Sequence, residues 1–106
     1  MKPILVPTGI KAAMEDGEVL FLYNRSSNPL KRMLLLGNGT GCIDKDYFSN
    51  PDNDGEIMFQ FWNFGLAPIT IKKGERIGQA VFQKYLIIDD DDADGERVGG
   101  HGSTGI

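Results

Sequence analysis

The chain has 106 residues and a formal net charge of −4, with 41% hydrophobic and 25% charged residues. This length is enough for one small domain with its own core. The acidic balance argues against a nucleic-acid binder that works by broad electrostatics, because such domains usually carry a basic face. We find neither a secretory signal nor an apolar run long enough to span a membrane, so we expect a soluble, cytoplasmic protein.

Short apolar segments alternate with turn residues along the chain, and fourteen glycines favour an all-β fold over a helical one. In chain order, we expect strands at 4–6, 19–23, 56–64, 68–71 and 77–88, an extended segment at 10–13, and a short helix leading into a strand at 30–36. This pattern predicts seven or eight short strands in a sandwich, jelly roll or barrel. Residues 1–88 form the expected core, 89–96 an acidic linker, and 97–106 a C-terminal arm.

Cys42 is the single cysteine, so an internal disulfide is not possible. Its apolar-to-acidic surroundings favour a buried small side chain over a reactive thiol. No His, Cys or Asp lies at zinc-ligand spacing from it.

A first polar cluster, Arg25-Ser26-Ser27, directly follows the expected strand at 19–23. A guanidinium and two hydroxyls suit phosphate oxygens, because they combine positive charge with hydrogen-bond donors. The alternative is a helix N-cap, in which Ser26 or Ser27 caps the segment that begins near Leu30.

A second cluster, Asp44-Lys45-Asp46-Tyr47, follows a glycine-rich turn. A carboxylate held at a strand end can act as a general base for water, and an aromatic ring three residues later can pack against a sugar or base. The alternative is a hairpin tip with solvated acids.

Two further clusters lie in the C-terminal third. In the segment 74–79 Gly74 forms a turn, and the amide Gln79 interrupts an apolar run; it lies on an exposed face or binds a ligand. In the tail, glycines alternate with Arg97, His101, Ser103 and Thr104, a composition that lets backbone N–H groups and hydroxyls approach a phosphate. The alternative there is a disordered tail with a solvated histidine.

In this order, the four clusters resemble motifs two to five of the trimeric dUTPase family. The sequences of the second and third motifs are most similar to those of Gram-positive bacterial or phage members. The matching segments are 25–27, 41–47, 74–79 and 97–105. The family's first motif, a segment like Ala-Gly-Tyr-Asp-Leu, is absent and is expected upstream of Ile4. We favour a truncation or a misplaced start, which would leave strand edges and apolar surface exposed.

The resemblance implies an all-β distorted jelly roll of the β-clip type with at most one short helix. It also implies a homotrimer with shared sites that hydrolyses dUTP to dUMP and pyrophosphate, in dUMP biosynthesis and dUTP removal. The implied cofactor is Mg²⁺, held through substrate phosphates and water without direct protein ligands.

The resemblance also implies a role for each matched residue. Asp44 is the general base, and Tyr47 packs on the deoxyribose. Asn38 and the backbone from Gly41 to Ile43 read the uracil. Ser26, Ser27 and Gln79 bind phosphate oxygens, and Arg25 supports them. In the C-terminal arm, the residues that close over the β- and γ-phosphates are Arg97, Gly102, Ser103 and Thr104, and His101 stacks on the uracil.

Two departures from the family pattern stand out. The glycine that usually follows the third-motif tyrosine by two residues is displaced to Gly55 by a longer loop, and the spacing from Arg97 to His101 is short. Two other functions compete with dUTP hydrolysis. One is a dCTP deaminase on the same fold; the other is an inactive, regulatory phage-type protein whose acidic run at 89–92 contacts a protein partner.

Overall fold

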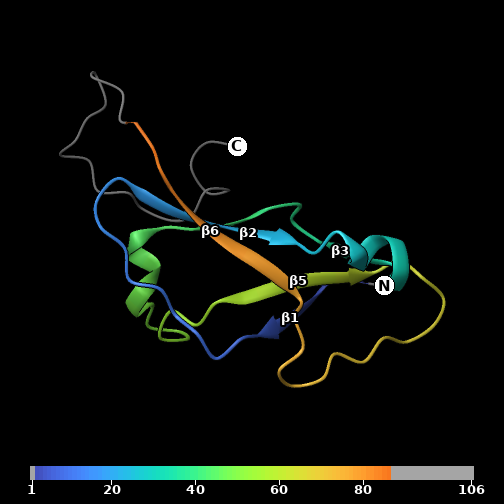
Figure 1. Ribbon diagram of the computed structural model, residues 1–106. Helices are drawn as coiled ribbons and strands as arrows, with labels where there is room; N and C mark the ends of the chain where they lie inside the picture. Colours follow the sequence, from blue (N-terminus) through green and yellow to red (C-terminus); the bar gives the residue numbers. More distant parts are fainter. Residues whose placement is uncertain (1, 87–106) are drawn as a thin grey trace.

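The computed structural model describes residues 2–86, which fold into two packed β-sheets (Figure 1). The strands are β1 (Ile4–Pro7), β2 (Glu18–Asn24), β3 (Leu34–Leu36), β4 (Gly41–Ile43), β5 (Met58–Asn63) and β6 (Gly78–Lys84). The helical elements are a π-helical turn, η1 (Asn28–Arg32), and a 3-10 helix, η2 (Lys45–Ser49). The expected all-β class is confirmed, with two short helical turns where one was expected. No helix within residues 2–86 is both long and apolar enough to cross a membrane.

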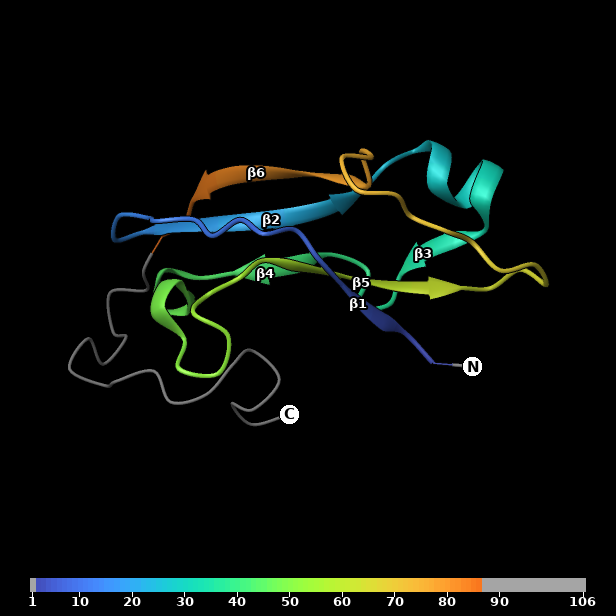
Figure 2. The same cartoon turned by 90° about the horizontal axis from the view of Figure 1, so that it is seen from below.

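Each sheet has three antiparallel strands, in the orders β1-β5-β3 and β4-β2-β6. Figure 2 shows β6 and β2 as one layer above β5 and β1. Strands distant in sequence become neighbours: Ile4 on β1 faces Phe61 on β5, and Glu18 on β2 faces Lys84 on β6. The first and last described strands, β1 and β6, each form the outer edge of one sheet and pair there with a strand that is distant in the sequence.

The core lies between the two sheets, where the period of two along each strand directs alternate side chains inward. β2 contributes Leu20 and Leu22, and β5 contributes Phe59 and Phe61, whose rings stack at 6.0 Å between centroids. Leu34, Leu36 and Ile57 complete the buried cluster. The expected inward face of the 56–64 segment is confirmed, while Trp62 on its other face is 38% exposed.

The strand expected at 68–71 is not formed. In this segment the carbonyl of Thr70 accepts a hydrogen bond from Nη2 of Arg32 at 3.0 Å, so that carbonyl bonds a side chain and not a neighbouring strand. Arg32 is half-buried and also pairs with Glu75.

Cys42 was expected to be buried and is exposed. It lies on β4 between Gly41 and Ile43, opposite Phe21. Because successive residues of a strand point to opposite faces, the inward direction of its two neighbours turns Cys42 outward.

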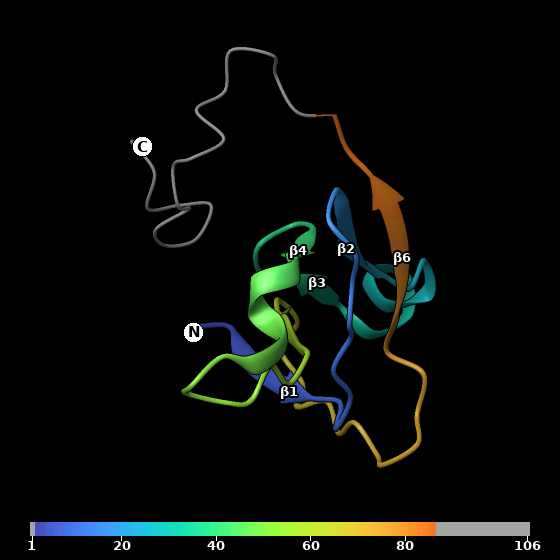
Figure 3. The same ribbon diagram turned by 90° about the vertical axis from the view of Figure 1, so that its left-hand side faces the viewer.

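The outer strands β1 and β6 carry exposed apolar side chains, among them Ile4, Leu5, Val81 and Phe82. Figure 3, viewed from the end that carries η2, shows β6 at the margin of its sheet. These side chains leave apolar surface along the outer edge of each sheet.

Candidate active site

The predicted site residues within the described part of the chain form two groups. One follows β2 near η1 and the other precedes η2, and these helical turns lie at opposite ends of the molecule (Figures 1 and 2). We call the first group the arginine cavity. It has a volume of about 460 Å³ and is lined by Asn24, Arg25, Ser26, Arg76, Gly78 and Gln79.

The ladder between β2 and β6 builds the arginine cavity. Tyr23 faces Gln79 and Asn24 faces Gly78, so the polar residues that follow β2 lie beside the first residues of β6. The strands can approach here because Gly78 has no side chain. A Cβ at this position would lie 2.6 Å from the carbonyl oxygen of Tyr23 and 2.4 Å from Cε2 of Phe59.

A buried amide, Asn28, holds the two walls of the arginine cavity together. Its side chain is 2% exposed. Nδ2 donates hydrogen bonds to Oδ1 of Asn24 at 2.8 Å and to the carbonyl of Ile77 at 2.9 Å. The Asn24 amide in turn donates to the carbonyl of Leu34 at 3.0 Å. Buried polar groups that are paired in this way fix one local geometry.

The charge of the arginine cavity suits an anion. Arg25 and Arg76 are both exposed, and Nη1 of Arg25 donates to the carbonyl of Arg76 at 3.5 Å. The described residues that line the cavity include no carboxylate. Ser27 occupies the N-cap position of η1, but its side chain makes no capping hydrogen bond. The capping alternative therefore does not account for the Ser27 hydroxyl.

The second group lies on the connection from β3 to η2. β3 and β4 belong to different sheets, so this segment is an arch between the sheets and not a hydrogen-bonded hairpin. Asn38 is exposed in the turn at its top, where the carbonyl of Asn38 accepts from the N–H of Thr40 at 2.9 Å. Gly41 is buried against Leu22, and a Cβ there would lie 2.9 Å from the leucine side chain.

The expected general base, Asp44, directly precedes η2, and Tyr47 lies on η2. Asp44 precedes the helix in extended conformation, and the N–H of Tyr47 donates to its carbonyl at 3.3 Å. Lys45 donates to Asp16 at 2.5 Å, and this hydrogen bond, with the attraction between the charges, raises the pKa of Lys45 and lowers the pKa of Asp16. The exposed ion pair ties the start of η2 to the turn before β2.

Asp44 is far from the arginine cavity within one chain. Leu20 faces Ile43 and Leu22 faces Gly41, so the chain beyond Ile43 runs toward the Glu18 end of β2, while Arg25 follows the other end. From the level of Val19 to Arg25 is six strand positions, or about 20 Å at roughly 3.3 Å per residue. One chain therefore does not place its Asp44 carboxylate beside its own arginine cavity.

The comparisons with known proteins agree on one family. The dUTPase family model matches residues 1–105. The chain belongs to the dUTPase family. It is 52% identical over 103 residues to the deoxyuridine 5'-triphosphate nucleotidohydrolase of Lactococcus lactis, covering 95% of this chain and 69% of the relative. The protein of the same name from Hahella chejuensis is 39% identical, covering 95% of this chain and 66% of the relative.

A solved dUTPase has the same fold. The crystal structure of dUTPase from Streptococcus mutans superposes with a TM-score of 0.80 at 49% identity, covering 82% of this chain and 68% of that chain. The chain thus spans about two thirds of the length of these dUTPase relatives.

Several expected dUTPase residues lie outside the described part of the chain. These are the members of the C-terminal arm, Arg97, His101, Gly102, Ser103 and Thr104, together with the acidic linker 89–96. Their roles stay predictions.

Sequence reasoning missed Arg76 and Asn28. Arg76 lies within the fourth-motif segment, and its charge next to Gln79 was a usable signal. Asn28 gave no signal, because an asparagine before a proline is typical of an exposed turn.

Proposed function

We propose that this chain is a subunit of a dUTP nucleotidohydrolase whose active site is completed by a second copy of the chain. The observation that carries the proposal is the separation of Asp44 from the arginine cavity. The relatives bear the name of this activity, and the residues proposed for its two halves lie at opposite ends of one subunit.

The arginine cavity would bind the triphosphate. Arg25 and Arg76 would neutralise phosphate charge, and Ser26, Gln79 and the adjacent Ser27 would donate hydrogen bonds to phosphate oxygens. Donors that are already in place where charge develops lower the barrier without reorganisation during the reaction. The buried Asn28 keeps both walls of this cavity in register before the substrate arrives.

Asp44 of a neighbouring copy would be the general base. Its carboxylate would take a proton from water while the water oxygen forms a bond to the α-phosphorus. The bond from that phosphorus to its bridging oxygen breaks, and pyrophosphate leaves with the electron pair in line with the attacking water. One positioned general base contributes about 10²–10⁴-fold to the rate.

The arch and η2 would select the nucleoside. Asn38 and the backbone from Gly41 to Ile43 would bond the edge of uracil, and Tyr47 would pack on the deoxyribose. In the C-terminal arm, the arginine and hydroxyl side chains would close over the outer phosphates, and His101 would stack on the base. These roles rest on the family resemblance.

The residues of the arginine cavity fit a metal that is held by the substrate. They offer guanidinium, hydroxyl and amide groups, and the described part of the chain contains no group of three or more metal-ligating side chains. Mg²⁺ keeps several waters and commonly binds through substrate phosphates, so Ser26, Ser27 and Gln79 would orient phosphates that carry the ion. When bound, Mg²⁺ would supply further neutralisation of the phosphate charge.

The family resemblance implies a homotrimer, and a closed ring with a head-to-tail interface can place Asp44 of each copy beside the arginine cavity of the next. The exposed apolar side chains of β1 and β6 offer surface for such an interface. Action in the cytoplasm and a regulatory protein partner both stay predictions.

The direct test is pyrophosphate release from dUTP with Mg²⁺, with dCTP and UTP as comparison substrates and ammonia release from dCTP as a check for deamination. Asp44→Asn should lower the rate by at least about 100-fold. Asp46→Asn is the matched control, since it removes a neighbouring charge from η2 and should keep the activity. Equal activity of Asp44→Asn and the unmodified chain would refute the role of Asp44.

Mixing two inactive variants tests the shared site. Asp44→Asn lacks the base and Arg25→Ala lacks part of the arginine cavity, so each alone should be inactive. In oligomers reassembled from equal amounts, about a quarter of shared sites combine an intact Asp44 with an intact Arg25. Recovered activity supports sites between copies, whereas no recovery after verified subunit exchange means that both residues act from one chain.

A further inference from the structure

The hydroxyl of Tyr47 is held from two sides. It donates a hydrogen bond to the backbone carbonyl of Glu56 at 2.7 Å and accepts one from Nδ2 of Asn53 at 2.8 Å. The side chain is half-buried on η2. A ring that is anchored at its tip as well as at Cβ has little freedom to swing, so these two bonds set its orientation.

Asn53 is itself held within the long loop after η2. Its Oδ1 accepts from the N–H of Gly55 at 3.0 Å, and its carbonyl accepts from the N–H of Glu56 at 3.1 Å. Gly55 has a φ of +79°, and a Cβ there would lie 2.1 Å from the carbonyl oxygen of Phe48 and 2.5 Å from that of Tyr47. The displaced glycine therefore lets the loop fold directly onto the backbone that carries Tyr47.

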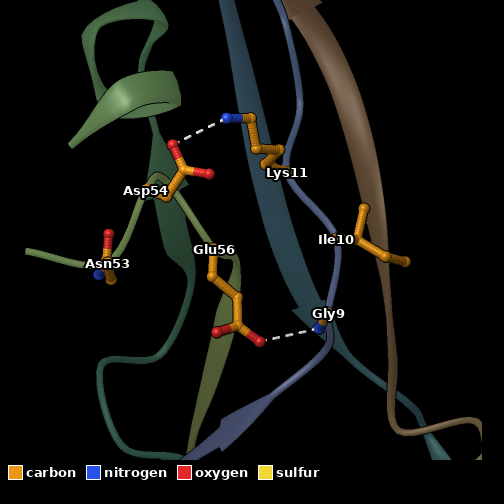
Figure 4. Close-up of a pocket in the computed structure, with 6 residues that line it drawn as sticks. All are labelled: Gly9, Ile10, Lys11, Asn53, Asp54 and Glu56. Atoms are coloured by element: carbon orange, nitrogen blue, oxygen red, sulfur yellow. Dashed lines mark hydrogen bonds and ion pairs between the residues drawn. The ribbon is translucent and has the colours of Figure 1, made fainter. Parts of the chain in front are cut away.

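The same loop is fastened to the segment after β1. Figure 4 shows Glu56 reaching the N–H of Gly9, at 2.9 Å, and Lys11 reaching Asp54, at 3.0 Å. The ammonium of Lys11 also lies 4.1 Å from the centroid of the Phe48 ring. These contacts with the segment after β1 restrain the loop, so that Asn53 is itself held in place when it binds the phenol hydroxyl of Tyr47.

We propose that Asn53 is a positioning residue that orients the Tyr47 ring and thereby sets the preference for 2'-deoxynucleotides over ribonucleotides. This inference rests on the proposed function, in which the ring packs on the deoxyribose. A ring that excludes a hydroxyl group by contact must resist displacement, and supporting hydrogen bonds supply that resistance. Asn53 is the side-chain donor of this support.

Asn53→Asp removes the donor while keeping an oxygen for the Gly55 N–H. Asn50→Asp is the matched control, because Oδ1 of Asn50 accepts from the N–H of Asp52 at 2.9 Å in the same loop. The ratio of kcat/KM for dUTP to that for UTP should fall about 3–10-fold in the Asn53 variant and stay unchanged in the control. Tyr47→Phe should lower the ratio similarly, and adding Asn53→Asp to it should cause no further loss.

Binding separates this inference from the proposed activity. Calorimetric titration with dUMP and UMP measures the same preference without hydrolysis. Preferential dUMP binding that weakens in Asn53→Asp supports the positioning role even in a chain that releases no pyrophosphate. Equal preference in the Asn53 and Asn50 variants overturns this inference alone, and a chain that binds neither nucleotide overturns it together with the proposed function.

Discussion

Replacing Asn28 with alanine should lower the free energy of unfolding by about 2–6 kcal/mol. The substitution leaves Oδ1 of Asn24 and the carbonyl of Ile77 without their donor, and each buried polar group without a partner costs about 1–3 kcal/mol. The total stability of a small domain is typically about 5–15 kcal/mol, so this change removes a large fraction of it.

Asn28→Asp removes the same hydrogen-bond donor while keeping the side-chain volume nearly constant. The two hydrogen bonds, 2.8 and 2.9 Å long, would become contacts between oxygen atoms, and the new carboxylate would be almost fully buried. This variant should be less stable than Asn28→Ala at neutral pH. Acidification should partly restore it, because a protonated carboxyl can again donate one hydrogen bond.

Urea denaturation at one fixed protein concentration measures both variants, since the stability of an oligomer depends on concentration. Asn63→Ala is the control. Its amide also makes two hydrogen bonds, to Ala67 and from Gly65, each 2.9 Å long, but closer to solvent. We expect a loss below about 1 kcal/mol there. Equal losses in Asn28→Ala and Asn63→Ala would refute the claim that the buried amide holds the cavity walls together.

Two further predictions concern the loop and an ion pair. Gly55→Ala should lower the free energy of unfolding by about 2–4 kcal/mol, because the alanine would have a positive φ and its Cβ would clash with the backbone. The control Gly39→Ala has a φ of +77° but no atom within 4 Å of the new Cβ, so it should lose only about 1–2 kcal/mol. Equal urea midpoints for the two variants would contradict this prediction. The hydrogen bond from the backbone N–H of Lys72, and after it the pairing with Arg32, lower the pKa of Glu75 below 4.5. The ionised Glu75 side chain therefore stabilises the fold above that pH, and this stabilisation is lost as pH falls through the folded-state pKa. Glu75→Gln should therefore flatten the loss of thermal stability in acid, and an unchanged pH profile would exclude this pair as a cause.

The strands that could be predicted were those with strong local patterns. The apolar run of β2 and the period of two in β5 needed no tertiary information. The segment 68–71 misled because Pro68 and Ile71 look like a strand, while the bond from Arg32 to Thr70 that replaces a ladder is visible only in three dimensions.

The sequence suggests which residues belong to the candidate site, but it does not predict how they are arranged. Four ordered clusters marked Arg25 and Asp44 correctly as polar residues that follow strands. Their separation depends on the register of β2 with β4, which no local pattern specifies. The supports around them, Asn28 and Asn53, were invisible because an asparagine in a turn-rich segment predicts an exposed loop.

The pairing of β2 with β6 has a consequence for the growing chain on the ribosome. Glu18 meets Lys84, so 66 residues separate the partners, and β2 must wait for the last described strand before its sheet can close. At roughly 5–20 residues per second, this wait lasts about 3–13 s. During that interval the apolar side chains of β2 have no neighbour from β6. A chaperone, or early packing of β2 against β4 and β5, would shield these side chains from other nascent chains.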